Sequence, residues 1–213
     1  MNLYGLERSV YTRIARLALE EKGVAYTLHE TEIFGPGVVP AEHLARHPFG
    51  RIPVLEHDGF ELYETTAITR YVDECCTGPA LQPAEPRARA RMNQVMSMLD
   101  SYAYRPMVWG VFVERVRLPH SGGVSNEATV AQSLAAARTC LSALAALVAC
   151  KPFLVGPGLT LADLHAFPIL AYLSLAPEGW QLLAEYPALE RWLAMMKSRP
   201  SVLRTTSRFE SGS

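Results

Sequence analysis

The sequence has few cysteines, no excess of charge of either sign and no long apolar run, and each absence excludes a class of protein. Its four cysteines among 213 residues form no Cys-x-x-Cys pair and no metal-ligand spacing, so we expect free thiols. Twenty basic and twenty-one acidic residues give a formal charge of −1, which argues against a broad surface for nucleic acid or anionic membrane. No apolar run is expected to reach the about 18 residues that a bilayer-spanning helix needs.

Other properties place the chain among ordinary globular proteins. Hydrophobic residues make up 49% and charged residues 19% of the sequence, a balance that excludes disorder as the main state. At this length the chain can form one large or two small domains and bury a core without disulfides or metals. The N-terminus lacks the basic start and apolar centre of a signal peptide, and free thiols are typical of a reducing compartment. The sequence therefore predicts a cytoplasmic protein without a metal site, a nucleic-acid partner or a membrane anchor.

The pattern changes near residues 77–86, which hold three prolines and a glycine and are typical of a linker. Before the linker, strand-like and helix-like segments alternate in the order β-α-β-α-β-β-α, and after it only helix-like segments follow. The chain is thus predicted to contain an α/β domain over residues 1–78 and an all-α domain over residues 87–213. The predicted strands cover 2–6, 24–28, 51–56 and 60–63, and the predicted helices cover 9–22, 41–46, 65–75, 87–117, 127–150, 160–175 and 187–198.

Ser9 stands where the first predicted helix begins. In one interpretation its side chain caps the helix by accepting a hydrogen bond from a main-chain N–H. In the other, its hydroxyl donates to an anion at the positive end of the helix, where a thiolate would be stabilised. No Gly-x-Ser-x-Gly elbow surrounds Ser9, so we do not expect it to act as a nucleophile.

Two further segments of the first domain carry signals for ligand binding. Pro53 lies inside a strand-like run, where a proline cannot donate to the ladder. It marks either an edge position or a cis Ile52–Pro53 bond, which would leave the Ile52 main chain free to pair with a peptide-like ligand. Thr65 is predicted to cap the next helix, whose N-terminus attracts a carboxylate, and Glu64 beside it can hold an ammonium group.

The remaining polar and aromatic patterns are interpreted structurally. His43 and His47 are four residues apart and could form a metal pair, but no third ligand is near in sequence, so a solvated surface is expected. The segment 160–163 has the pattern of a capping box and is assigned to folding. Large side chains that can either fill a core or line a pocket are Tyr11, Phe34, Tyr104, Met107, Trp109 and Phe112.

Several of these signals occur together in one order along the chain. They are SVYTR at residues 9–13, PFGRIP at 48–53, ETTAI at 64–68 and LTLAD at 159–163. At this spacing the motifs resemble those of cytosolic glutathione S-transferases, and the resemblance extends to about Pro200. The first motif is most similar to the serine-type members, namely the phi class and theta-like bacterial relatives.

The resemblance implies a thioredoxin-like N-terminal domain that binds glutathione, a helical domain that contributes the hydrophobic co-substrate site, and a homodimer. It implies transfer of reduced glutathione to hydrophobic electrophiles through a thiolate stabilised by Ser9, without a metal or redox cofactor. Tyr11 is a rival for this role, because some bacterial relatives use a hydroxyl in this loop. The main chain of Ile52, beside a cis Pro53, would pair with the cysteinyl part of glutathione.

The same resemblance assigns the two ends of glutathione. Glu64 and Thr65 would hold the γ-glutamyl end. Phi-like enzymes usually carry a basic pair before the PFG motif for the glycyl carboxylate, but Val38 and Val39 occupy those positions here, and Arg51 could supply the charge instead. The large side chains named above would line the co-substrate site. A glutathione peroxidase acting through the same thiolate and a non-catalytic binding or regulatory protein remain as alternatives, and the missing basic pair favours the second.

Overall fold

The computed structural model describes residues 1–34, 39–148 and 151–210, and it divides into two compact units. The first unit comprises residues 1–81 together with the C-terminal segment that begins at Pro200. The second unit comprises residues 82–199.

The C-terminal segment is where the division differs from the prediction, which assigned all of residues 87–213 to the helical domain. Helix α10 (Pro200–Arg204) packs against helix α1 of the first unit. The Ser201 hydroxyl donates to the carboxylate of Glu21, and the Arg204 guanidinium donates to the carboxylate of Glu20. These contacts join segments about 180 positions apart in sequence, so no local sequence pattern predicts them.

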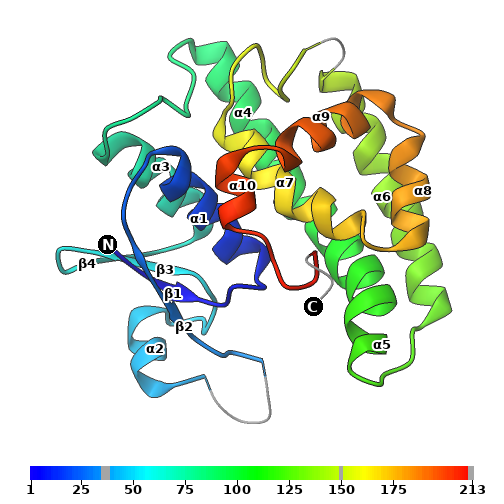
Figure 1. Ribbon diagram of the computed structural model, residues 1–213, viewed down its shortest axis with the longest axis horizontal. Coiled ribbons are helices and arrows are strands. Elements are labelled where there is room, and N and C mark those ends of the chain that lie inside the picture. The colour runs from blue at the N-terminus through cyan, green and yellow to red at the C-terminus, as the bar shows by residue number, and fades with distance from the viewer. Residues whose placement is uncertain (35–38, 149–150, 211–213) are drawn as a thin grey trace. The chain divides into compact units, whose positions relative to one another are not determined.

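The first unit contains the predicted mixed sheet, with the strand order β2-β1-β3-β4. Strand β1 pairs in parallel with β2, and antiparallel pairing joins β1 to β3 and β3 to β4 (Figure 1). The elements follow the predicted order β-α-β-α-β-β-α. Their bounds are β1 Asn2–Gly5, α1 Val10–Glu21, β2 Thr27–Glu30, α2 Ala41–Arg46, β3 Val54–His57, β4 Phe60–Tyr63 and α3 Thr65–Cys75.

Two strands begin later than predicted, and pairing explains both shifts. Strand β1 starts at Asn2, opposite Thr27, so the residues before Thr27 have no parallel partner on β1. Pro53 has no N–H to give to a ladder, and β3 accordingly begins at Val54, opposite Tyr4.

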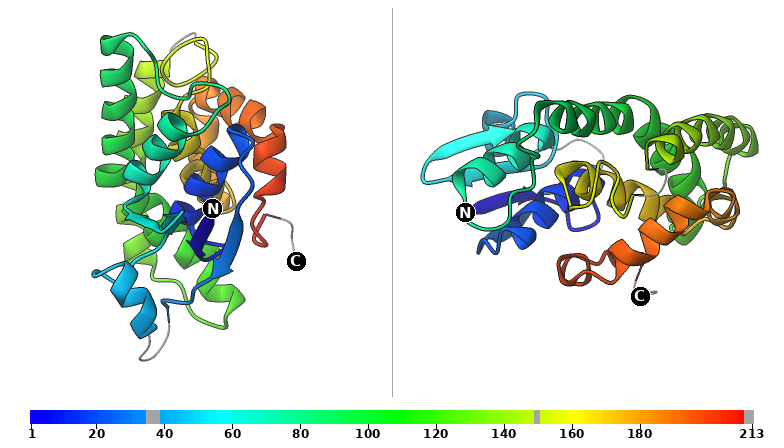
Figure 2. Two further views of the ribbon diagram at one scale, coloured as in Figure 1. Left: turned by 90° about the vertical axis from the view of Figure 1, so that its left-hand side faces the viewer. Right: turned by 90° about the horizontal axis from the view of Figure 1, so that it is seen from above.

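Helix α1 is amphipathic and packs on one face of the sheet. It buries Ile14, Leu17 and Ala18, which recur at helical spacing. At the end of β1, a Cβ on Gly5 would lie 2.4 Å from Oγ1 of Thr12, so only glycine allows this close approach. Helix α3 packs against α1 on the same face, and α2 lies on the other face of the sheet (Figures 1 and 2).

The second unit is helical throughout, as predicted. The expected helix over 87–117 is present as one continuous helical run (Figure 2). Its second half is π-helical, with hydrogen bonds from residue i to residue i+5. Helix α8 was not predicted. It begins with Pro177 at its first position, where proline is common, so this proline was a signal for its start. The bounds are α4 Pro86–Met98, η1 Leu99–Ala103, η2 Arg105–Arg117, α5 Leu118–His120, α6 Glu127–Val148, α7 Leu161–Leu173, α8 Pro177–Ala184 and α9 Pro187–Lys197.

The predicted capping box begins helix α7, which is buried along its whole length. The Asp163 carboxylate accepts hydrogen bonds from the main-chain N–H groups of Thr160 and Leu154, each at 2.9 Å. It also accepts from the Thr160 hydroxyl and from the indole N–H of Trp192, again at 2.9 Å. One buried carboxylate therefore fixes the start of α7, the preceding loop and helix α9, which confirms the assignment of this motif to folding.

Helix α6 corrects one expectation from the sequence. By length and composition it is apolar enough to cross a membrane. In the structure it packs against η2, α8 and α9, and it buries Ala137, Leu141 and Leu144 among them. Only 28% of its most apolar stretch is buried, so these contacts account for the buried face of α6 and not for the whole apolar run.

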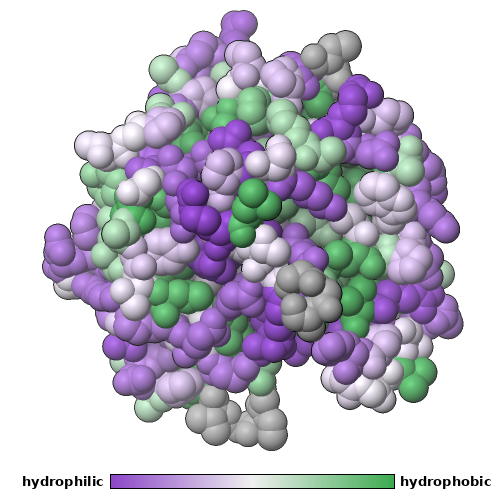
Figure 3. Space-filling view, viewed as in Figure 1, coloured by the Kyte–Doolittle hydropathy of each residue, from purple (hydrophilic) through white to green (hydrophobic). Residues whose placement is uncertain are grey.

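The surface and the cysteines agree with the composition. On the face drawn in Figure 3, hydrophilic residues are interspersed with small apolar groups. In the part of the chain that the structure describes, Cys75, Cys76 and Cys140 are free thiols, and Cys150 lies outside the described residues.

Candidate functional site

The strand register places the three segments that carry the predicted site residues at one end of the sheet. Tyr4 of β1 lies opposite Val54 of β3, and Val54 lies opposite Tyr63 of β4, so the three residues form a row across the sheet. Ser9 follows β1 beyond this row, Ile52 precedes β3, and Glu64 follows β4 directly. Residues far apart in sequence are therefore gathered at the edge where helices α1 and α3 also begin.

Ser9 is the N-cap of helix α1, with extended backbone dihedral angles. Its hydroxyl oxygen accepts a long hydrogen bond of 3.4 Å from the main-chain N–H of Thr12. Accepting this bond leaves the hydroxyl proton available to donate. The capping role predicted for Ser9 is confirmed, and the half-buried hydroxyl stands at the positive end of the helix, where a bound anion is stabilised.

The two tyrosines near this helix differ in position. The Tyr4 ring stacks on the imidazole of His29, with centroids 4.8 Å apart, and the Arg46 guanidinium lies 4.2 Å from its centroid. Because Arg46 belongs to α2, the Tyr4 ring lies on the α2 face of the sheet, whereas Gly5 faces α1. Tyr11 lies in the first turn of α1, two residues after Ser9, and its side chain is half-buried. It therefore remains a rival to Ser9.

The Ile52–Pro53 peptide bond is cis, which decides between the two alternatives that the sequence left open. Both residues are buried, and the ladder of β3 begins only at Val54. The sheet pairing therefore does not use the main chain of Ile52, and an extended ligand can add to it as a short further strand.

Two histidines that the sequence assigned to a solvated surface instead brace this loop. His43 and His47 are 1% and 2% exposed. His43 Nε2 lies 2.7 Å from the carbonyl oxygen of Arg51 and can donate to it, which fixes the residue next to Ile52. The His47 ring packs on the Tyr63 ring of β4, with centroids 4.6 Å apart. Their spacing of four, from α2 to its C-cap His47, is visible in the sequence, but their burial depends on partners in other segments.

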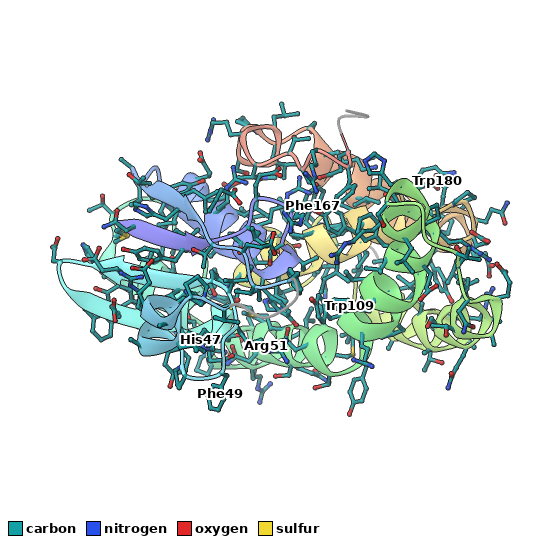
Figure 4. The ribbon with its side chains drawn as sticks, turned by 90° about the horizontal axis from the view of Figure 1, so that it is seen from below. His47, Phe49, Arg51, Trp109, Phe167 and Trp180 are labelled. Atoms are coloured by element: carbon teal, nitrogen blue, oxygen red, sulfur yellow. The ribbon has the colours of Figure 1, made fainter. Side chains whose placement is uncertain are left out.

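The loop and its side chains are seen together in Figure 4, where His47, Phe49 and Arg51 gather at one edge of the first unit. The Phe49 ring is 70% exposed and meets the His47 and Tyr63 rings edge-on. Burial lowers the pKa of His47, while the nearby Glu64 carboxylate opposes this effect. His47 is therefore neutral at physiological pH and serves as a packed ring.

The start of helix α3 differs from the prediction in which residue caps it. Glu64 is itself the N-cap of helix α3, and Thr65, the predicted cap, is the first helical residue and is buried. Glu64 has a positive φ of 71°, which side-chain-bearing residues rarely adopt and which costs about 1–3 kcal/mol. Its exposed side chain makes no capping hydrogen bond among the described residues. The N–H groups of the first turn of α3 and the Glu64 carboxylate are therefore both available at this edge.

The positions of the missing basic pair are only partly described. Val38 lies outside the described residues, and the Val39 side chain lies beside Gly50, about 3.3 Å from where a Cβ of Gly50 would stand. Arg51 is exposed and next to Ile52 in the same loop. It is the cation that the loop offers to an anionic group.

The large side chains predicted to line a co-substrate site separate into two groups. Met107 and Phe112 are buried in the helical unit, where the Phe112 ring stacks on Tyr172 with centroids 4.3 Å apart, so both are core residues. Tyr104 is half-buried, and its hydroxyl accepts a hydrogen bond of 3.0 Å from the indole N–H of the more exposed Trp109. Tyr11 and Phe34 are half-buried in the first unit. Four of the six side chains thus reach the surface.

Comparison with known proteins agrees with this geometry. Family models described as glutathione S-transferase N-terminal domain and C-terminal domain match residues 3–80 and 127–194. Glutathione S-transferase 4 of Zea mays is 32% identical over 94% of this chain and 89% of its own length, and glutathione S-transferase F13 of Arabidopsis thaliana is 27% identical over 97% and 94%. A theta class glutathione S-transferase from Xanthomonas axonopodis pv. citri, solved with glutathione bound, is 27% identical with a TM-score of 0.83, and covers 98% of each chain.

Proposed function

Because the chain belongs to the glutathione S-transferase family and is a glutathione transferase, we propose that it conjugates glutathione to hydrophobic electrophiles at the sheet edge formed by Ser9, Ile52 and Glu64. The register that aligns Tyr4, Val54 and Tyr63 is the observation that carries this proposal. We infer further that the enzyme is of the serine type, similar to phi-like and theta-like members, because the SVYTR motif supports this assignment.

The Ser9 hydroxyl is the proposed activating group. It donates a hydrogen bond to the glutathione sulfur and keeps its proton, and the N-terminus of α1 adds positive potential, so both lower the pKa of the bound thiol from its usual about 8.5. The thiol proton leaves to water, and the thiolate attacks the electrophile. A carbon–sulfur bond forms, and the leaving group departs with the electron pair of its bond to carbon.

Three further groups hold the rest of glutathione in this proposal. The Ile52 main chain pairs with the cysteinyl backbone, as a strand added to the sheet. The N–H groups at Thr65 and the following residues bind the γ-glutamyl carboxylate, and Glu64 binds its ammonium group. Arg51 binds the glycyl carboxylate in place of the missing basic pair. For the electrophile, Tyr11 and Phe34 of the same unit offer half-buried aromatic surface.

The Ser9 role is tested by Ser9→Ala, with Ser9→Thr as the variant that keeps a hydroxyl and a cap. We expect Ser9→Ala to lower kcat with an aryl halide about 100-fold, as for the loss of one positioned donor. The thiolate absorbance of bound glutathione should then titrate at a higher pH, and Ser9→Thr should restore part of both. An unchanged turnover in Ser9→Ala would contradict the assignment, and Tyr11→Phe would then be the variant to measure.

Two other functions remain to be compared with glutathione conjugation. Peroxidase activity would use the same thiolate, and assays of one preparation with an organic hydroperoxide and an aryl halide compare the two rates directly. The names of the relatives favour a transferase over a non-catalytic binding protein. The resemblance further implies a cytoplasmic homodimer, which sedimentation would detect at twice the chain mass of 23.5 kDa.

A further inference from the structure

Two adjacent cysteines at the end of helix α3 place their sulfur atoms side by side. Cys75 is the last residue of the helix, and Cys76 is its C-cap, with extended dihedral angles of φ −107° and ψ 146°. Neighbouring side chains normally diverge, by about 100° around a helix or to opposite faces of a strand. At this junction between the two conformations, the sulfur atoms are 3.3 Å apart. The chain therefore presents a converged dithiol, which adjacency in sequence does not by itself ensure.

The dithiol is accessible and rests on a well-held support. Cys75 is exposed and Cys76 is half-buried. The buried Lys22 ammonium donates to the carboxylate and carbonyl of Asp73, before the two cysteines, and to the carbonyl of Pro79, after them, each at 3.1 Å. The two cysteines lie between Asp73 and Pro79, so both flanks of the pair are tied to the same cation.

A second contact supports the pair from its own helix. The Tyr71 hydroxyl lies 2.8 Å from Nδ1 of His57, and its side chain also interacts with the Cys75 thiol. Burial, together with the hydrogen bond to Cys75, raises the pKa of Cys76 to about 11. Cys76 is therefore a protonated thiol at neutral pH, a form that peroxides oxidise slowly because the thiolate is the reactive species.

We propose that Cys75 and Cys76 form a chelating site for trivalent arsenicals, as representatives of soft, thiophilic metalloid compounds. Sulfur ligands select soft centres. A bond from sulfur to such a centre is about 2.3 Å long, as in zinc thiolates. If two such bonds meet at about a right angle, the two sulfur atoms are about 3.3 Å apart. The observed separation of the sulfur atoms matches this bite, so binding requires little rearrangement.

The binding step is balanced without any oxidant. An arsenical with one arsenic–oxygen double bond and an organic group reacts with both thiols. Two arsenic–sulfur bonds form, both bonds to oxygen break, and the two thiol protons leave with that oxygen as one water molecule. Arsenic stays trivalent throughout. A disulfide between the two cysteines would instead need an oxidant and would shorten the separation to about 2.05 Å.

The experiment uses the full-length protein and phenylarsine oxide as the probe, with intact-mass spectrometry as the measurement. We expect one adduct per chain that survives millimolar glutathione, a monothiol, and is removed by the dithiol 2,3-dimercaptopropanol. Cys75→Ser and Cys76→Ser should each lose the glutathione-resistant adduct. Cys140→Ser, at a buried cysteine outside the pair, is the matched control and should keep it.

Each other outcome overturns the proposal. An adduct that glutathione alone removes would show simple attachment to one thiol. A resistant adduct that persists in Cys75→Ser would place the site elsewhere, and the absence of any adduct would exclude the site. Circular dichroism checks that the serine variants are folded, and their aryl-halide turnover should equal that of the parent. The mass readout does not depend on catalysis, so failure here is distinguishable from failure of the proposed function.

Discussion

The guanidinium of Arg13 is bonded to the carboxylate of Glu210, although 197 positions separate the two residues. Arg13 lies in the first turn of α1, where its N–H donates to the Ser9 carbonyl at 2.9 Å. Its side chain is 1% exposed, and that of Glu210 is 14% exposed. The end of the described chain is thus fastened to the helix turn that carries Ser9.

This ion pair should be important for stability. Replacing one partner of a buried pair leaves the other charge buried and uncompensated, so we expect Glu210→Ala to lower the free energy of unfolding by about 3 kcal/mol. Arg204→Gln, which breaks a more exposed pair of the same segment, is the control and should cost about 0.5 kcal/mol. Urea unfolding measures both, and equal losses would contradict the special role of the Arg13 pair.

The contact between Gly5 and Thr12 predicts a strong effect of one added methyl group. Gly5→Ala would force α1 away from β1, and overpacking of this kind costs about 1–3 kcal/mol. Gly156→Ala adds the same methyl group where no atom lies within 4 Å and should be nearly neutral. Because Thr12→Ala removes the two closest atoms, it should recover part of the loss in the double variant. Additive losses in thermal unfolding would show that the contact is not the cause.

His43 is predicted to position the loop of Arg51 and Ile52, which is proposed to bind glutathione. His43→Leu leaves the Arg51 carbonyl, whose hydrogen bond is only partly buried, without its donor, which costs about 1 kcal/mol. We expect the lost hydrogen bond to destabilise the complex with glutathione. KM for glutathione then rises about 10-fold for each 1.4 kcal/mol of this loss, while kcat changes little. His43→Gln carries an amide N–H at a similar reach and should restore part of the affinity. A fall in kcat at constant KM would indicate another role.

His47 predicts a dependence of stability on pH. Burial lowers the pKa of His47 in the folded state below its ordinary value of about 6.5. As the pH falls below about 6.5, the unfolded chain takes up a proton that the folded chain does not, so stability decreases. His47→Gln should therefore flatten the dependence of the unfolding free energy on pH on the acidic side of this value.

The matched control for His47 is His120→Gln, at an exposed histidine in the helical unit. It should leave the dependence on pH as in the parent protein. A parent-like slope in His47→Gln, measured by urea unfolding at several pH values, would show that His47 is not the group responsible.

Local signals predicted a large part of this fold. Helices α2 and α3 and strand β4 have the predicted bounds, and Ser9 is the predicted helix cap. These features depend on residues within about four positions of one another, so a single sequence contains the information. The two strands that begin late do so because their partners lie in other segments.

The site divides in the same way. The sequence by itself identified Ser9, Pro53 and Glu64 as candidates for ligand binding, because they stand at element ends that local patterns reveal. Only the tertiary structure decided that His43 and His47 are buried, that Glu64 has a positive φ and that Arg13 meets Glu210. The physical reason is that burial, close approach and charge pairing depend on contacts between distant segments, and these contacts exist only after the strands are aligned and the helices are packed.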